Sequence, residues 1–335
     1  MFLPDSFGQE YLFGIRFSKM KKALKTIGIV ILAIVAVIVV ALAALYIWNR
    51  IMLKQEEPMS EQPIGQLVEV DGHNMCVYTE GEGDHTLLFL SGSGTPAPIL
   101  DFKCLYSLLD DDYKIVVIEK YGYGFSDIVD TERSFTTILR QDREVLEKAG
   151  IEGPFILCPH SMSGLEAIMW AQDYPDEVEA IVGLDNVLPR TYDNYDIEGT
   201  LKLEKYISFA RDVGILRFYY SDSFLPDALT QEEKDLYRAI ASRKTCNVDI
   251  VNEGRAIAEA VKIIDSKPIP DVPMLMFISD GEETKGSDWV GNHYAYAEGL
   301  TNARVIELGC GHYVHYFKAE EIATETRSFI NDQLG

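Results

Sequence analysis

The chain has 335 residues, of which 47% are hydrophobic and 25% charged, enough for one large folded domain with an appendage. Its formal net charge of −23 is unevenly distributed along the chain. Residues 1–54 carry seven Lys or Arg and two acidic residues, whereas the remainder carries 23 Lys or Arg and 51 acidic residues. A body this acidic argues against nucleic acid as a partner and against docking on anionic lipid. The five cysteines are irregularly spaced without a Cys-x-x-Cys, so neither a zinc site nor a disulfide framework is indicated.

Residues 27–48 form an apolar run without a charged side chain. As a helix this run would be about 33 Å long, enough to cross the hydrocarbon core of a bilayer. Basic residues gather just before the run, so the positive-inside rule predicts that residues 1–26 are cytoplasmic and that everything after the run lies outside the cytoplasm. A cleaved secretory signal is the alternative, although the run is longer than a usual signal core. We therefore expect a single-pass anchor in the cell membrane, with the lipid bilayer as a partner, followed by a polar linker over residues 49–65.

Short, mostly apolar runs after residue 65 predict β-strands. Residues 67–70 and 75–78 flank Asp71-Gly72, a favoured tight turn, and predict a hairpin. Further runs lie at residues 86–90, 114–118, 155–158, 178–184, 274–278 and 304–308, and helical patterns lie at residues 134–149, 165–172 and 320–334. This alternation predicts an α/β fold with a mostly parallel central sheet and helices on both faces.

The turn after the strand at residues 155–158 carries Ser161. Only a tight turn fits between that strand and the next helix, so the serine is lifted clear of the backbone, towards the first N–H groups of the helix. This geometry suits a nucleophile whose attack creates an oxyanion. The pattern departs from the Gly-x-Ser-x-Gly elbow, because Pro159 and Ser163 hold the glycine positions and Gly164 follows.

The strand–helix alternation is interrupted over residues 186–270. Three helical patterns fall there, at residues 201–215, 230–242 and 248–264, and Thr230-x-x-Glu233 forms a capping box. Pro268 and Pro270 close the insertion, after which the strand pattern resumes.

Four segments resemble the α/β-hydrolase superfamily in their order and spacing. Residues 88–94 are similar to its strand and oxyanion loop, and residues 118–127 to its Asp-x-x-Gly-x-Gly-x-Ser segment. Residues 160–164 resemble the nucleophile elbow, and residues 309–315 resemble the Gly-x-Gly-His loop that carries the base. The resemblance covers about residues 66–335 and implies an α/β-hydrolase domain with a helical cap over residues 186–270.

The resemblance and the chemistry of the residues assign roles to the site. Ser161 is the expected nucleophile and His312 the expected base, with His315 as a rival that we interpret as a structural or pocket-wall residue. The backbone N–H groups of Met162 and Ser93 are expected to form the oxyanion hole. Ser91 replaces the histidine usual in the oxyanion loop, which should not abolish a hole built from backbone donors.

Two aspartates remain open as the acid that orients the base. Asp185 ends the strand at residues 178–184 in Gly-Leu-Asp-Asn, similar to the Gly-Leu-Asp-Pro of lipases. Asp280 follows the next strand, where most of the superfamily keeps its acid, with Glu282 and Glu283 nearby. We place Asp185 slightly ahead.

Aromatic residues are frequent in the expected cap: Tyr192, Tyr195, Tyr206, Phe209, Phe218, Tyr219, Tyr220 and Phe224. They either line a substrate pocket, for which Tyr219, Tyr220 and Phe224 are the candidates, or only pack the cap onto the body. An aromatic wall favours a small-molecule substrate with an apolar acyl group. No motif suggests a metal or an organic cofactor.

The sequence therefore predicts a membrane-anchored serine hydrolase, of carboxylesterase or lipase type, that cleaves an ester or another acyl bond through an acyl-enzyme. A proline-releasing aminopeptidase is the alternative within enzymes, and an acidic pocket near the cap would favour it. A catalytically silent α/β-hydrolase that only binds is the alternative from another class.

Overall fold

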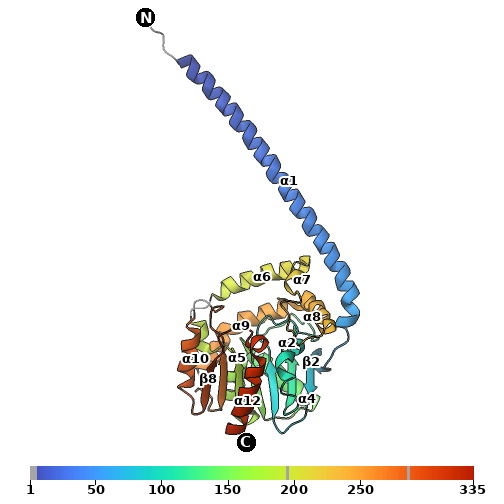
Figure 1. Ribbon diagram of the computed structural model, residues 1–335, viewed down its shortest axis with the longest axis vertical. Helices are drawn as coiled ribbons and strands as arrows, with labels where there is room; N and C mark the ends of the chain where they lie inside the picture. Colours follow the sequence, from blue (N-terminus) through green and yellow to red (C-terminus); the bar gives the residue numbers. More distant parts are fainter. Residues whose placement is uncertain (1–5, 194–195, 285–286) are drawn as a thin grey trace. The chain divides into compact units, whose positions relative to one another are not determined.

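The computed structural model describes residues 6–193, 196–284 and 287–335, and for residues 6–15 and 18 only the backbone (Figure 1). The described chain forms two compact units, Met1–Met52 and Leu53–Gly335. Tyr195, one of the cap aromatics expected from the sequence, lies outside the described residues.

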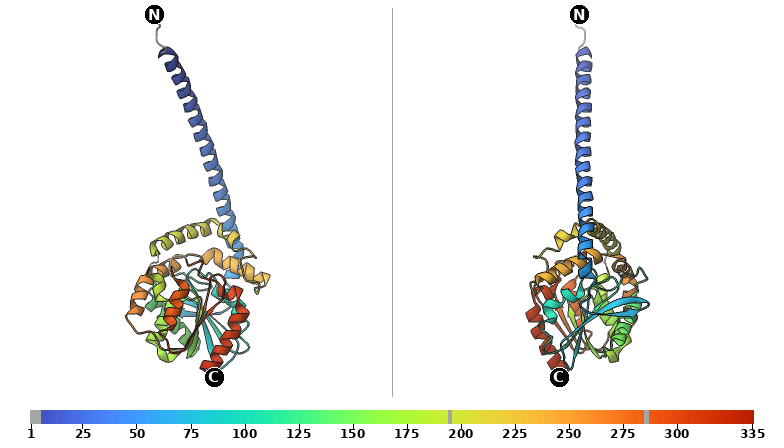
Figure 2. Two further views of the ribbon diagram at one scale, coloured as in Figure 1. Left: turned by 60° about the vertical axis from the view of Figure 1, so that its left-hand side comes forward. Right: turned by 90° about the vertical axis from the view of Figure 1, so that its right-hand side faces the viewer.

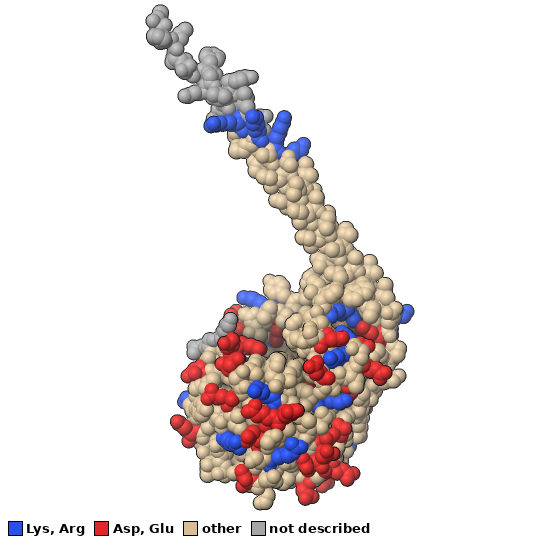
Figure 3. Space-filling model, in the orientation of Figure 1, with Lys and Arg blue, Asp and Glu red and all other residues tan. Residues whose placement is uncertain are grey.

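The first unit consists of the larger part of helix α1, Ser6–Ser60. Its stretch from Lys19 onward has a mean hydropathy of 3.3 over its most apolar window and is long and apolar enough to cross a membrane. The apolar side chains are exposed, as for Leu32 at 70%, and Figure 3 shows a length of this helix without charged side chains. An exposed apolar surface of this size is unusual in a water-soluble protein.

The polar segment that the sequence predicts as a linker differs from that expectation, because α1 continues through it to Ser60. Lys54, Gln55, Glu56 and Glu57 are favourable helix formers, so nothing before Pro58 interrupts the helix. From Leu53 onward the helix belongs to the second unit. Glu56 there accepts two hydrogen bonds from the guanidinium group of Arg217, at 2.7 and 2.8 Å.

The second unit is built on one eight-stranded sheet, which confirms the predicted mostly parallel architecture. The strands are β1 Gln66–Val70, β2 His73–Glu80, β3 Thr86–Leu90, β4 Lys114–Glu119, β5 Phe155–Pro159, β6 Val178–Leu184, β7 Met274–Ile278 and β8 Ala303–Glu307. Their order is β1-β2-β4-β3-β5-β6-β7-β8; β2 pairs antiparallel with both β1 and β4, and the other neighbouring pairs are parallel. The predicted hairpin is present, and its turn residues Asp71 and Gly72 both have positive φ, 49° and 81°.

Helices cover both faces of the sheet, as predicted. On one face lie α2 Pro98–Asp101, α3 Lys103–Tyr106 and α12 Ala319–Gln333. On the other face lie α4 Phe135–Ala149, α5 Ser163–Asp173, α9 Val248–Asp265 and α10 Trp289–Ala297. Alternation along β5 divides the core, since Phe155 and Leu157 pack on the second face and Ile156 and Cys158 on the first.

The insertion between β6 and β7 contains α6 Ile197–Val213, α7 Leu216–Tyr219, α8 Gln231–Lys244 and α9. Figure 2 shows α6 lying across one end of the layered body. The predicted capping box at Thr230 and Glu233 is present at the start of α8. The last helix of the insertion, α9, differs from a cap helix: Ile257, Ala260 and Ile264 pack into the core beside the sheet, because they form one apolar face.

The remaining short elements connect these layers. They are the 3₁₀-helices η1 Pro175–Glu177 and η2 Pro189–Tyr192 and the helix α11 Val314–Phe317. Acidic side chains are spread over the visible face of the second unit, as its composition implies (Figure 3).

Candidate active site

Ser161 stands on the turn between β5 and α5 with a φ of +55°, a region that non-glycine residues seldom occupy. Such a strained position turns the side chain out of the strand direction. Gly92, in the loop after β3, packs directly on this turn. A Cβ added at Gly92 would lie 2.6 Å from the Cβ of Ser161 and 2.9 Å from the carbonyl oxygen of His160, so only glycine fits there.

The two departures from the elbow pattern have a structural explanation. Ser163 is buried, and its hydroxyl lies 2.7 Å from the carbonyl oxygen of Leu90 and 2.8 Å from that of His160, so the extra polar atom is satisfied. Pro159 is the last residue of β5 and lies after Leu157, the last β5 residue in the regular pairing with β6. The crowded glycine of this turn is Gly164, whose added Cβ would lie 2.2 Å from the carbonyl oxygen of Val187.

His312, in the loop between β8 and α11, joins the serine to an acid. Its Nε2 lies 2.8 Å from Ser161 Oγ, and its Nδ1 lies 2.5 Å from Asp185 Oδ2. Because a carboxylate only accepts hydrogen bonds, the proton belongs on Nδ1, and Nε2 is free to accept from the serine hydroxyl. Ser161, His312 and Asp185 therefore form one line of hydrogen bonds.

Asp185 ends β6, is fully buried and has a φ of +49°. Its second oxygen, Oδ1, accepts hydrogen bonds from the backbone N–H of Ser279 at 2.6 Å and from Trp289 Nε1 at 2.7 Å. Trp289 lies in α10, belongs to no motif in the sequence, and is close to the acid only in three dimensions.

Asp280, the other candidate acid, is not part of this line of hydrogen bonds. Its Oδ1 accepts a hydrogen bond from the backbone N–H of Glu282, two residues on, at 3.0 Å. The side chains of Glu282 and Glu283 are exposed. Of the two aspartates left open by the sequence, the structure brings Asp185 to the histidine.

A second pair of histidines supports the loop that carries His312. His160 is buried and lies 3.3 Å, through Nε2, from the carbonyl oxygen of His312. Burial, followed by the charges of His312 and His315, holds the pKa of His160 well below its usual value, so the ring is neutral. His315 is buried against Asp101, 3.2 Å from its Oδ2, and does not line the cavity, as its structural interpretation expects.

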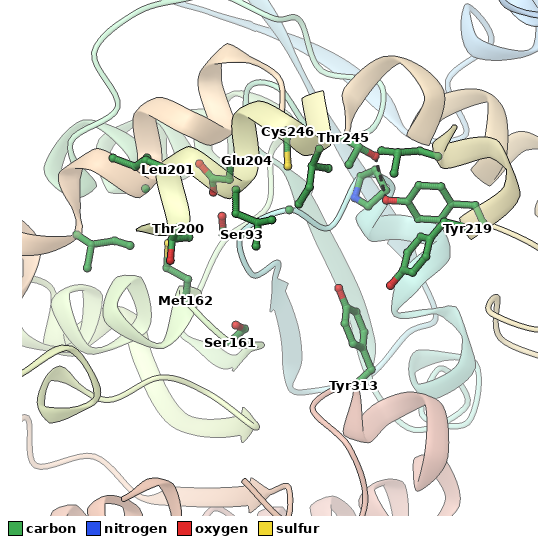
Figure 4. Close-up of a pocket in the computed structure, with 18 of the residues that line it drawn as sticks. Ser93, Ser161, Met162, Thr200, Leu201, Glu204, Tyr219, Thr245, Cys246 and Tyr313 are labelled. Carbon is green, nitrogen blue, oxygen red and sulfur yellow. Dashed lines mark hydrogen bonds between the residues drawn. The ribbon is translucent and has the colours of Figure 1, made fainter. Parts of the chain in front are cut away.

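The expected oxyanion donors lie beside the serine. Ser93 and Met162 line the same cavity as Ser161, from the loop after β3 and from the start of α5 (Figure 4). Within the described part of the chain, no hydrogen bond uses the backbone N–H of either residue. These two N–H groups are therefore available to a ligand.

A cavity of about 610 Å³ opens between the serine and the cap. Figure 4 shows Leu201 and Glu204 of α6 across the cavity from Ser161, with Tyr219 and Tyr313 at one side. The three pocket residues expected from the sequence, Tyr219, Tyr220 and Phe224, all line it; their rings also pack against one another.

The other cap aromatics have different roles. Tyr206, Phe209 and Phe218 are 73%, 56% and 65% exposed and do not line the cavity, whereas Tyr192 does. Tyr220 also packs into a cluster with Leu100 of α2, so both interpretations of the aromatic residues hold for different rings.

None of the cysteines is placed for chemistry at the serine. Cys158 is buried in the core, and Cys310 is half-buried, with the pKa of its thiol raised to about 11 by burial. Cys246 lines the cavity, which the sequence did not indicate, and burial raises the pKa of its thiol to about 12.

A sequence profile of the alpha/beta hydrolase fold matches residues 86–319, more than half of the chain. The chain belongs to the α/β-hydrolase family. YbdG, an uncharacterised protein of Bacillus subtilis (strain 168), is 31% identical to this α/β-hydrolase over 322 residues, which are 93% of this chain and 99% of YbdG.

Solved structures of low sequence identity share the fold of this α/β-hydrolase. Cfl2 from Burkholderia cenocepacia has a TM-score of 0.64 at 22% identity and covers 80% of this chain and 98% of its own. A mutant of DbjA has a TM-score of 0.62 at 18% identity and covers 81% of this chain and 99% of its own.

Proposed function

We propose that this α/β-hydrolase is a serine hydrolase that cleaves an ester or another acyl bond of a small molecule through an acyl-enzyme. The observation that carries the proposal is the line of hydrogen bonds from Ser161 Oγ through His312 to Asp185, with Ser161 lining the cavity under the cap. A serine hydroxyl is a weak nucleophile until a base removes its proton, and this arrangement supplies the base and the group that orients it.

In the acylation step, Ser161 Oγ attacks the carbonyl carbon while its proton moves to His312 Nε2. Asp185 keeps the Nδ1 proton in place through its hydrogen bond and stabilises the imidazolium that forms. The negative charge on the substrate oxygen is stabilised by the backbone N–H groups of Met162 and Ser93. The leaving group then takes the proton from His312 Nε2 and departs, which leaves an ester on Ser161.

In the deacylation step, water takes the place of the leaving group. His312 Nε2 accepts a proton from the water, whose oxygen attacks the acyl carbon, and the tetrahedral intermediate again develops its charge at the two backbone donors. Collapse releases the carboxylic acid, and Ser161 regains its proton from His312. Each cycle consumes one water and uses the side chains of Ser161, His312 and Asp185 together with the two backbone N–H groups.

The part of the substrate that enters the cavity is an apolar acyl or alkyl group, because the cavity is lined by the aromatic rings of Tyr219, Tyr220 and Phe224. When an apolar group binds against a concave wall of aromatic and aliphatic side chains, the burial of apolar surface stabilises the complex. A catalytically silent binding module is the less supported reading, because such a module has no need for a serine, a histidine and an acid in one hydrogen-bonded line.

A fluorophosphonate probe tests the nucleophile, because it reacts covalently only with an activated serine. We expect the full-length chain in lipid nanodiscs to be labelled, and the Ser161→Ala variant to show no labelling. Ser163→Ala is a matched control, since it removes a neighbouring buried hydroxyl and leaves Ser161 in place. Labelling that persists in Ser161→Ala would exclude this serine as the nucleophile.

We further propose that α1 anchors the enzyme in the cell membrane and that the hydrolase domain lies outside the cytoplasm. The proposal rests on the length and hydropathy of α1 and on the basic residues that precede its apolar part.

A further inference from the structure

Glu204, in α6, is the one charged side chain among the described residues that line the cavity. It is only 8% exposed, and its Oε2 has no hydrogen-bond partner within the described part of the chain. Figure 4 shows its carboxyl group on the cap side of the cavity that holds Ser161. An acidic group is thus buried in a cavity with no other charged side chain among the described residues, and its Oε2 is free to accept hydrogen bonds from a ligand.

No ion pair to Glu204 forms among the described residues. The guanidinium group of Arg255 is close enough for its charge to lower the pKa of Glu204, but it donates a hydrogen bond to Asn252 Oδ1 at 2.5 Å. Opposite lies Gly254 of α9, where an added Cβ would be 3.7 and 3.8 Å from the two carboxyl oxygens of Glu204. The ammonium group of Lys120 is held by Glu166 at 3.0 Å and by Glu253 at 2.8 Å, and none of these three residues lines the cavity.

The chemistry of a buried carboxyl group indicates what would complete it. A carboxylate taken out of water without a partner is costly, and a partner of opposite charge in a cavity of low polarity interacts with it more strongly than it would in water. Burial first, and then the charge of Glu253, raises the pKa of Glu204 to about 7, so a bound cation would restore the ionised form near neutral pH. A protonated amine supplies both the charge and the hydrogen-bond donors.

We propose that the cavity selects acyl substrates that carry a protonated amine, and that Glu204 binds this amine while Ser161 attacks the acyl bond. The proposal rests on the serine hydrolase function proposed above and narrows its substrate class. The apolar walls, which include Leu201 and Ile257, would hold the alkyl chain between the two polar ends. An acidic group in the cap is also the feature that would distinguish a proline-releasing aminopeptidase from a simple esterase.

Matched ester pairs test the selectivity. The first member is a p-nitrophenyl ω-aminoacyl ester, in a series from propionyl to octanoyl, and the second has a methyl group in place of the ammonium group. For at least one chain length, we expect the wild type in nanodiscs to prefer the amino ester in kcat/KM by about tenfold or more. In Glu204→Gln this ratio should fall about tenfold, through KM rather than kcat, and Glu204→Asp should restore part of it.

Glu198→Gln is the matched control, because Glu198 lies on the same helix, carries the same charge and is exposed outside the cavity. It should leave both rates and their ratio unchanged. A wild type that favours the methyl ester at every chain length, or a ratio that Glu204→Gln does not alter, would overturn the proposal. A thermal melt of each variant separates these results from misfolding, and the Asp variant keeps the test decisive if the Gln variant does not fold.

A binding measurement separates this proposal from the proposed catalytic function. The binding of n-hexylammonium chloride to the Ser161→Ala variant is measured by calorimetry, which needs no turnover. Hexanol is the neutral comparison. Hexylammonium should bind and should weaken about tenfold or more when Glu204→Gln is added, whereas hexanol should not discriminate. If no ester is hydrolysed but this difference is found, the catalytic proposal fails and the amine site stands. If esters are hydrolysed but the difference is missing, the amine site fails alone.

Discussion

At the scale of single residues, Asp185 uses both carboxylate oxygens. Oδ2 faces the imidazole of His312, and Oδ1 accepts hydrogen bonds from Trp289 and from the backbone of Ser279. A buried carboxylate held from three directions cannot rotate away from the histidine, so the ring keeps the tautomer that a general base requires.

Replacing the two aspartates should separate their roles. Asp185→Asn keeps the shape of the side chain, but its amide can present a donor to Nδ1 and favour the wrong tautomer, so we expect kcat to fall by about 10³ to 10⁴. Asp280→Asn alters a turn that also forms with asparagine, so we expect nearly wild-type activity. Hydrolysis of p-nitrophenyl butyrate by the two variants measures both effects. Equal, nearly normal rates would remove Asp185 from the mechanism.

Glu204 also makes the stability of the protein depend on pH. Its pKa is raised to about 7 in the folded state by burial and then by Glu253, so between the unfolded value of 4.5 and about 7 the folded state binds the additional proton. The free energy of unfolding contributed by this group therefore falls as pH rises through that window.

Glu204→Gln removes this pH-dependent term. Relative to the wild type, the variant should gain about 1 to 3 kcal/mol in free energy of unfolding between pH 5 and pH 8. Denaturant titrations of both proteins at a series of pH values measure the difference, and Glu198→Gln serves as the exposed control. A difference that stays constant across the range would mean that Glu204 does not titrate there.

At the scale of secondary-structure elements, one buried ion-pair cluster joins the end of β4 to two helices on the same face of the sheet. Lys120 follows β4 and contacts Glu166 of α5 and Glu253 of α9, and all three are almost completely buried. Burial alone would lower the pKa of Lys120, but the two carboxylates outweigh it and raise the pKa. Tyr123 donates a hydrogen bond to Glu253 at 2.5 Å, which adds the loop after β4 to the cluster.

Lys120→Met should be strongly destabilising, because it leaves two carboxylates buried without their cation. We expect a loss of about 3 to 5 kcal/mol in the free energy of unfolding. Lys318→Met is the comparison, since Lys318 pairs with Glu321 on the surface and should cost less than about 1 kcal/mol. Urea denaturation of the two variants gives both values, and equal losses would contradict the role assigned to the cluster.

At the scale of the whole molecule, the two units differ in where their apolar side chains lie. The described apolar side chains of α1 are exposed along the helix, whereas the second unit buries its apolar residues on the two faces of a sheet. These compositions are what a membrane-spanning segment and a water-facing enzyme require.

A protease added to intact cells tests the proposed orientation. If the hydrolase domain lies outside the cytoplasm, the chain beyond residue 60 should be digested, while a tag placed before residue 16 should be protected until the membrane is opened. The physical reason is that five basic residues between Arg16 and Lys25 are retained on the cytoplasmic side. Protection of the domain in intact cells, with digestion of the tag, would reverse the orientation.

The sequence by itself was enough to predict the eight strands, most of the longer helices apart from α10, and the edge of the sheet at which the candidate site lies. Strands such as β5 and β6 are short apolar runs, and the turns after them carry Ser161 and Asp185, so their period and boundaries are local properties of the chain. Parallel strands bring their carboxyl ends to one edge, which is why residues as distant as Ser161 and His312 could be expected to meet.

Only the tertiary structure decided which acid meets the histidine, and which polar groups remain without a partner. Asp185 and Asp280 both follow strands, and the distinction depends on how β6, β7 and the loop after β8 are placed side by side. Trp289 and Glu204 gave no signal in the sequence, because a tryptophan and a glutamate on amphipathic helices look alike whether they face solvent, core or cavity. Burial and pairing are properties of what surrounds a side chain, and those surroundings come from segments far away in the sequence.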